Sequence, residues 1–127
     1  MVKAKSHLLI IDDCSFTLEV MKDQLTRAGY EVSIADNVVY SNDLIYGSNP
    51  PSLILLDVLM PLMGGDRKVE MLKRRSKSKE IPVVLMSSLP VDQLQAKAQE
   101  VGADAFLHKP ISEEALLEMV GRFMQKG

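Results

Sequence analysis

The sequence predicts an α/β protein built on a doubly wound, five-stranded parallel sheet with helices on both faces. Short β-rich runs alternate with longer helical patterns along the chain of 127 residues. The runs 8–11, 53–56 and 83–86 are continuously apolar, which is typical of strands that helices cover on both sides. We therefore expect residues 1–127 to form one domain around one sheet.

The predicted elements follow one another in regular order. Strands are expected near residues 7–12, 30–35, 52–57, 81–87 and 104–107. Amphipathic helices are expected over residues 15–28, 66–75, 91–101 and 112–124. The alternation requires one more crossover over residues 37–46, where Val38, Val39 and Asn42 are poor helix formers. We expect that helix to be short or mobile.

Glycine, serine and proline mark the element boundaries. Gly29 and Gly102 stand where helix C-caps belong, because glycine adopts the left-handed conformation at no steric cost. Ser112 is placed to cap the last helix at its N-terminus. Pro82 and Pro90 occupy the starts of elements, where a missing N–H costs least.

Composition narrows the function classes. The chain is 46% apolar and 25% charged, and its net charge of -2 gives no basis for binding nucleic acid or an anionic membrane. Cys14 is the only cysteine, which excludes an internal disulfide, and we interpret it as a small packing residue. No signal peptide or membrane span is recognised, so we expect a cytoplasmic protein.

One basic run stands out from this balanced composition. It consists of Lys73, Arg74 and Arg75, followed by Lys77 and Lys79. Because the run stands at the end of a predicted helix, we interpret it as offsetting the negative end of the helix dipole rather than as a nucleic-acid site.

Polar residues suited to phosphate or metal chemistry stand at the ends of four of the predicted strands: Asp12 with Asp13, then Asp57, Ser87 and Lys109. Singly, an Asp or Ser after a strand is commonly a helix cap or turn former, and a lone Lys is commonly a surface amine. Together they would meet in one crevice, because the carboxyl ends of parallel strands lie at the same edge of a sheet. The whole set of residues therefore predicts a phosphate- or metal-binding site at this edge of the sheet.

The residue types point to phosphoryl transfer. Crowded carboxylates repel one another and favour a hard divalent cation such as Mg²⁺, which a phosphate commonly completes. Asp57 is the best nucleophile candidate, because it ends the most apolar strand and precedes a glycine-containing loop over residues 60–65. Lys109 would neutralise the phosphoryl oxygens, and Ser87 would donate a hydrogen bond to one of them.

The spaced motifs resemble the receiver domain of bacterial two-component response regulators, of the single-domain chemotaxis type. The resemblance covers nearly the whole chain and rests on Asp12-Asp13, Asp57-Val58-Leu59-Met60-Pro61-Leu62-Met63-Gly64-Gly65, Ser87-Ser88 and Phe106-Leu107-His108-Lys109-Pro110. It implies a flavodoxin-like sheet with strand order 2-1-3-4-5. It also implies that a sensor histidine kinase or a phosphotransfer protein donates a phosphoryl group to Asp57.

The resemblance assigns further roles. Asp13 and Asp57 would ligate Mg²⁺ directly, with the backbone carbonyl of Leu59 as a third ligand, and Asp12 would act largely through water. Ser87 and Phe106 match the family's switch pair. Lys109 would pair with the phosphoryl oxygens, and its bond to the following proline would be cis.

A partner surface is expected on the fourth helix, the fifth strand and the fifth helix, for a downstream protein or a second copy of the chain. Phe106 contributes to it by resemblance. Leu117 and Met119 widen the apolar arc of the last helix beyond one core-facing stripe. Direct contacts with nucleic acid or membrane are not expected.

Two other functions compete with a phosphoacceptor. Phosphatases of the haloacid dehalogenase type carry a second Asp two residues after the nucleophile, where this chain has Leu59. A pseudo-receiver would keep the fold as a protein-interaction module that takes no phosphate, and the retained site residues argue against it. A stand-alone regulator, a phosphorelay intermediate and a receiver from a longer chain remain open.

Overall fold

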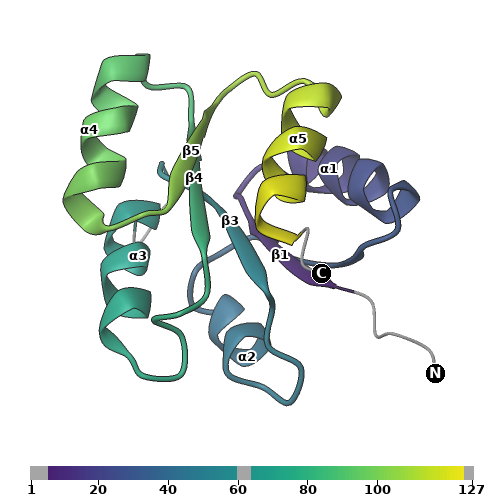
Figure 1. Cartoon of the computed structure of the whole chain (residues 1–127), viewed down its shortest axis with the longest axis horizontal. Coiled ribbons are helices and arrows are strands. Elements are labelled where there is room, and N and C mark those ends of the chain that lie inside the picture. The colour runs from purple at the N-terminus through teal and green to yellow at the C-terminus, as the bar shows by residue number, and fades with distance from the viewer. Residues whose placement is uncertain (1–5, 60–63, 125–127) are drawn as a thin grey trace.

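The structure, a computed structural model, describes residues 6–59 and 64–124 and confirms the predicted α/β architecture (Figure 1). Loop residues 60–63, part of the predicted glycine-containing loop, lie outside the described residues. The elements in chain order are β1 (His7–Ile11), α1 (Ser15–Arg27), β2 (Glu31–Ala35), α2 (Ser41–Ile45), β3 (Leu53–Asp57), α3 (Gly65–Arg74), β4 (Val83–Ser87), α4 (Val91–Val101), β5 (Ala105–His108) and α5 (Glu113–Met124).

The five strands form one parallel sheet in the order β2-β1-β3-β4-β5, as expected from the resemblance. The strand order reverses between β1 and β3, which start the two halves of the sheet. Ile11 pairs in register with Leu56 across this point. The residues that follow β1 and end β3 therefore share one crevice, at the carboxyl edge of the sheet.

Successive strand residues point to opposite faces, and each face is covered by helices. One face packs under α2, α3 and α4, with Leu9, Ile54 and Leu85 among its buried residues. The other face packs under α1 and α5, with Leu8 and Leu55 in its core. In Figure 1 the two groups of helices stand on either side of the sheet. This two-sided burial explains the continuously apolar central strands.

The predicted boundaries hold to within a few residues. Gly29 and Gly102 adopt φ of 102° and 83° after α1 and α4, as C-caps require. The Ser112 hydroxyl accepts a hydrogen bond from the N–H of Ala115 at 3.0 Å and so caps α5. Pro82 falls outside β4, although its carbonyl still accepts a hydrogen bond from Ile54 at 3.0 Å.

Helix α2 is short, as predicted, and spans only Ser41–Ile45. The preceding Val38 is nevertheless buried against the core, while Val39 is 62% exposed. No helix within residues 6–59 and 64–124 has the length and apolar character needed to cross a bilayer.

Candidate functional site

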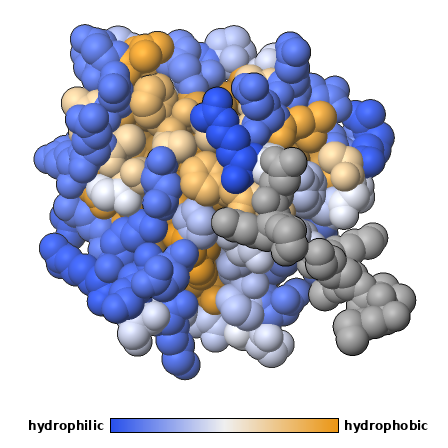
Figure 2. Space-filling model, viewed as in Figure 1, coloured by the Kyte–Doolittle hydropathy of each residue, from blue (hydrophilic) through white to orange (hydrophobic). Residues whose placement is uncertain are grey.

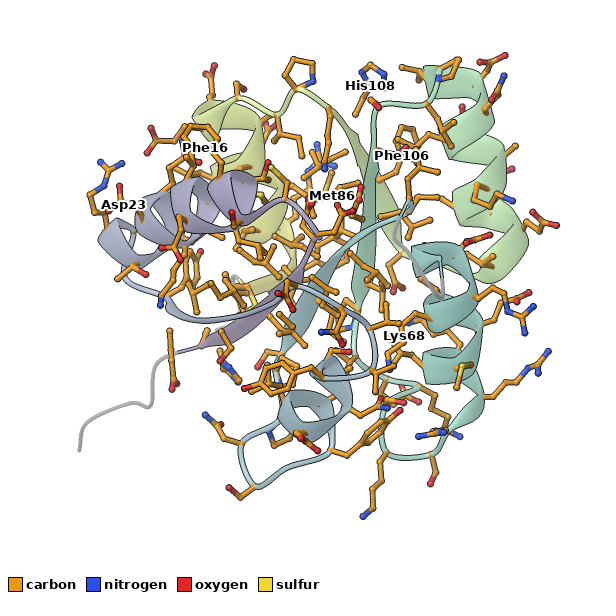
Figure 3. The ribbon with its side chains drawn as sticks, turned by 180° about the vertical axis from the view of Figure 1, so that it is seen from behind. Phe16, Asp23, Lys68, Met86, Phe106 and His108 are labelled. Carbon is orange, nitrogen blue, oxygen red and sulfur yellow. The ribbon has the colours of Figure 1, made fainter. Side chains whose placement is uncertain are left out.

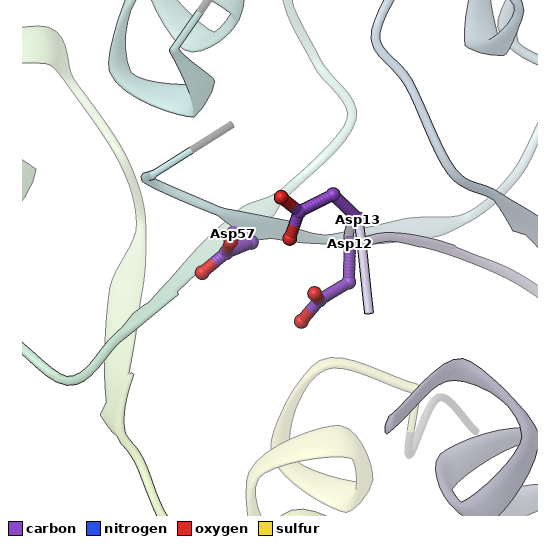
Figure 4. Close-up of side chains that lie close together, drawn as sticks. All are labelled: Asp12, Asp13 and Asp57. Atoms are coloured by element: carbon purple, nitrogen blue, oxygen red, sulfur yellow. The ribbon is translucent and has the colours of Figure 1, made fainter. Parts of the chain in front are cut away.

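Three carboxylates meet at the carboxyl edge of the sheet (Figure 4). Asp12 and Asp13 follow β1, and Asp57 is the last residue of the neighbouring β3. Each contributes one carboxylate oxygen to a group whose members all lie within 4.8 Å of one another. The convergence predicted from the strand ends is therefore present.

Asp12, Asp13 and Asp57 form the acidic cluster. Lys109, in the segment after β5, lies against it. Its Nζ lies 2.7 Å from Asp12 Oδ2 and 3.3 Å from Asp57 Oδ1. Burial acts to lower the pKa of Lys109, but its hydrogen bond to Asp12 and the charges of Asp12 and Asp57 outweigh burial and raise that pKa. The ammonium group stays charged at neutral pH and faces the nucleophile candidate.

The acidic cluster fits a hard divalent cation. Three carboxylates face one ammonium group, so negative charge remains in excess. Asp12 is fully buried and also accepts a hydrogen bond from the Cys14 N–H at 2.9 Å, whereas Asp13 is exposed. An oxygen-only donor set that is open to solvent on one side suits Mg²⁺, which retains several waters.

The pKa of Asp57 is strongly shifted. Asp57 is 5% exposed, and this burial raises its pKa to about 6, with a further contribution from the charge of Asp12 and an opposing one from Lys109. Ionisation of Asp57 in the folded, metal-free protein therefore costs free energy.

Replacing Asp57 by Asn should stabilise the metal-free protein at pH 8, by about 1 to 3 kcal/mol. The folded-state pKa, about 6, exceeds the ordinary 3.8, so the wild type loses stability as the pH rises through this interval. Urea unfolding of both proteins in EDTA measures the difference. It should vanish near pH 4, and an equal difference at both pH values would contradict the assigned origin of the shift.

Ser87 and Phe106 lie on the neighbouring strands β4 and β5. Ser87 is 1% exposed, and its Oγ accepts a hydrogen bond from the Leu89 N–H at 3.0 Å. Phe106 pairs in register with Leu85 and is half-buried against the core under α2, α3 and α4. Figure 3 shows its ring on the α4 side of β5. The peptide bond between Lys109 and Pro110 is cis, as expected.

Gly65 has a structural role that the sequence reasoning missed. Its N–H donates to the Val58 carbonyl at 2.8 Å, and a Cβ at this position would lie 2.0 Å from the Asp57 backbone carbonyl oxygen. Only glycine allows α3 to begin this close to β3. The glycine pair 64–65 was the available signal in the sequence.

Cys14 departs from its predicted packing role. It precedes α1 and is exposed, and only its backbone N–H takes part in the site, as a donor to Asp12. Leu59, two residues after Asp57, is also exposed, at 57%.

Comparison with known proteins identifies the family. Residues 8–121 match the family model described as the response regulator receiver domain. This chain belongs to that family. Receiver domains are signalling domains of two-component systems. They bind Mg²⁺ at an acidic pocket and work with histidine kinases or phosphotransfer proteins and with effector domains.

Individual relatives agree with this family. The transcriptional regulatory protein CusR of Escherichia coli is 35% identical over 120 residues. The aligned region covers 94% of this chain but only 52% of CusR, so this chain spans about half the length of that relative. The two-component response regulator ORR5 of rice (Oryza sativa) is 33% identical over 94% of this chain and 89% of ORR5. The chemotaxis response regulator CheY4 of Vibrio cholerae superposes with a TM-score of 0.87, at 26% identity over 95% of this chain and all of CheY4.

Proposed function

We propose that residues 1–127 form a phosphoacceptor domain in which Asp57 takes a phosphoryl group from a phosphohistidine. The observation that carries this proposal is the position of Asp57, buried at a strand end within 4.8 Å of two other carboxylates and 3.3 Å from the Lys109 ammonium group. A carboxylate in that position can act as a nucleophile toward phosphorus while a fixed cation stabilises the transferred charge.

The transfer itself is a single displacement at phosphorus. An oxygen of the Asp57 carboxylate forms a bond to phosphorus as the donor's P–N bond breaks, and the imidazole nitrogen keeps the electron pair. The Lys109 ammonium group pairs with the phosphoryl oxygens. The Ser87 hydroxyl, on the next strand, donates a hydrogen bond to another oxygen after leaving the Leu89 N–H.

The same residues would hold the metal. Asp13 and Asp57 would ligate Mg²⁺ directly together with the Leu59 carbonyl, and Asp12, which already bonds Lys109, would act through water. When bound, Mg²⁺ supplies positive charge that offsets the repulsion between the carboxylates and the phosphoryl oxygens.

Labelling by a small-molecule donor tests this function. Incubation with acetyl phosphate and Mg²⁺ should add one phosphoryl group per chain, read by intact mass, and EDTA should prevent it. Labelling of equal extent in EDTA would contradict the metal requirement. Absence of labelling under both conditions would favour a pseudo-receiver that only binds partners.

A groove beside Lys109 is the proposed docking surface for the donor protein. It has a volume of about 400 Å³, and Phe16 at its rim is 76% exposed. A donor histidine must approach Asp57 over this edge of the sheet, and a large exposed aromatic ring is a suitable anchor for it. The lining residues are Phe16, Thr17, Val20, Met21, Gln24, Ser88, Lys109, Pro110 and Ile111.

Phe16→Ala should slow phosphoryl transfer from a protein donor about tenfold, since buried aromatic anchors dominate interface energies. Labelling by acetyl phosphate should not change, because Phe16 lies outside the acidic cluster. Val91→Ala is the matched control, an exposed apolar residue at the start of α4. Equal slowing with both donors would place the effect of Phe16 in the chemistry rather than in docking.

The proposed output surface covers α4, β5 and α5. Figure 2 shows apolar surface between α4 and α5. Leu117 and Met119 are half-buried and pack against the core under α1 and α5, so each offers only part of its side chain to a downstream protein or a second copy. Phosphorylation would act by stabilising an arrangement in which Ser87 and Phe106 have moved.

A further inference from the structure

The basic run at the end of α3 is only partly explained by the helix dipole. Lys73 and Arg74 lie in the last turn of α3, where positive charge offsets the dipole. Lys73 Nζ also donates to the carbonyl of Ile81 at 3.0 Å and to Asp104 at 2.9 Å. Arg75, Lys77 and Lys79 lie beyond the helix and are exposed. They take part in none of the ion pairs formed within residues 6–59 and 64–124.

The turn that carries these cations is held by internal hydrogen bonds. Ser78 is fully buried, and its Oγ donates to the Leu72 carbonyl at 2.8 Å. The Tyr46 hydroxyl, from the segment after α2, bonds the same Oγ at 2.9 Å. The Lys79 N–H donates to the Arg75 carbonyl at 2.8 Å. The cations therefore project from a pre-organised turn, which lowers the entropy cost of binding a ligand.

A hollow of about 400 Å³, called here the Tyr46 hollow, lies against this turn. It is lined by Tyr46, Arg75, Ser76 and Lys77. The Arg75 guanidinium carbon stands 5.3 Å from the centroid of the Tyr46 ring, a stacked arrangement that leaves guanidinium N–H groups free to donate. Aromatic surface, two cations and a hydroxyl thus face one space, whose volume is in the range of small-ligand sites.

The positive charge of this region extends inward to Lys68. Lys68 is 3% exposed and bonds Asn42 of α2, and Figure 3 shows it on α3. Burial, followed by the charge of Arg75, lowers its pKa to about 8. Of the residues that line the Tyr46 hollow, Arg75 and Lys77 are cations that form no ion pair within residues 6–59 and 64–124, so the hollow has an excess of positive charge that an anion would compensate.

We propose that the Tyr46 hollow binds a nucleoside polyphosphate. Arg75 and Lys77 would take the phosphate oxygens, with the Ser76 hydroxyl as a further donor. The base would lie against the stacked Tyr46 and Arg75 side chains. An inorganic phosphate would use the cations but neither the aromatic surface nor most of the volume. The turn precedes β4, so the hollow lies at the opposite edge of the sheet from Asp57 (Figure 1).

Titration calorimetry with ATP, ADP, AMP and tripolyphosphate, in EDTA and at low salt, tests the proposal. EDTA removes metal that would otherwise bridge a nucleotide to the acidic cluster. ATP should bind most tightly and AMP least. Arg75→Gln and Lys77→Gln, both at exposed positions, should each weaken ATP binding about tenfold, and Arg75→Lys should not restore it. Lys22→Gln, which removes an exposed cation on α1, is the matched control.

Amide NMR shifts induced by ATP should be largest at Tyr46, Ser76 and Lys77. Asp57→Asn should bind ATP normally, so this test is independent of the proposed phosphoacceptor function. Absence of ATP binding at millimolar concentration, or equal weakening by Lys22→Gln, would overturn the proposal. Tripolyphosphate binding as tightly as ATP would overturn the nucleoside part of it.

Discussion

Asp57→Asn should abolish phosphoryl labelling by acetyl phosphate and Mg²⁺. The amide has nearly the same size as the carboxylate and stays beside Lys109, but its neutral oxygen is a poor nucleophile toward phosphorus. The substitution also removes one of the three carboxylates that could hold a metal ion in the acidic cluster. Intact mass after a fixed incubation measures the loss, which should be complete.

Asp36→Asn is the matched control for this variant. Asp36 also lies at the carboxyl end of a strand, directly after β2, but it is exposed and lies outside the acidic cluster. Its labelling should equal that of the wild type. Equal labelling of the Asp57 variant and the wild type would transfer the phosphoacceptor role to another residue.

Gly65→Ala should lower the free energy of unfolding by about 3 kcal/mol. The added Cβ would stand 2.0 Å from the Asp57 carbonyl oxygen and 2.8 Å from its carbonyl carbon. Both are backbone atoms, so no side-chain rotation relieves the clash, and α3 must shift away from β3. This shift would also move Asp57, so labelling should slow together with the loss of stability.

Gly121→Ala should have the opposite effect on the free energy of unfolding. Gly121 lies inside α5, and a Cβ there would meet no atom within 4 Å. Alanine should raise the free energy of unfolding by about 0.5 to 1 kcal/mol, because it restricts the unfolded chain and favours the helix. Urea unfolding of both variants measures the two free energies of unfolding. Equal destabilisation by Gly65→Ala and Gly121→Ala would contradict the view that the close approach of α3 to β3 causes the effect at Gly65.

The fold was predictable because its signals are local. Continuous apolar runs marked the buried strands, and Gly102 and Ser112 marked the ends of helices whose caps the structure shows. Helix α2 was the uncertain element because its local signals are weak: the β-branched Val38 and Val39 disfavour a helix. The shortness of α2 was nevertheless foreseen from those residues.

The acidic cluster was predictable because parallel strands end at one edge, which places Asp12 beside Asp57 once the strand order is known. The Tyr46 hollow was not predictable, because it depends on contact between Tyr46 and Arg75, which are far apart in the sequence and carry no shared motif. The need for glycine at position 65 also depends on tertiary geometry, namely how close α3 comes to β3.

Locating the phosphoryl group on the labelled wild-type protein tests the central claim most directly. Borohydride reduces an aspartyl phosphate to homoserine, which leaves a permanent mark that peptide fragmentation can assign to one position. Homoserine is expected at position 57 alone. Homoserine at position 12 or 13, or a labelled protein that yields none, would contradict it.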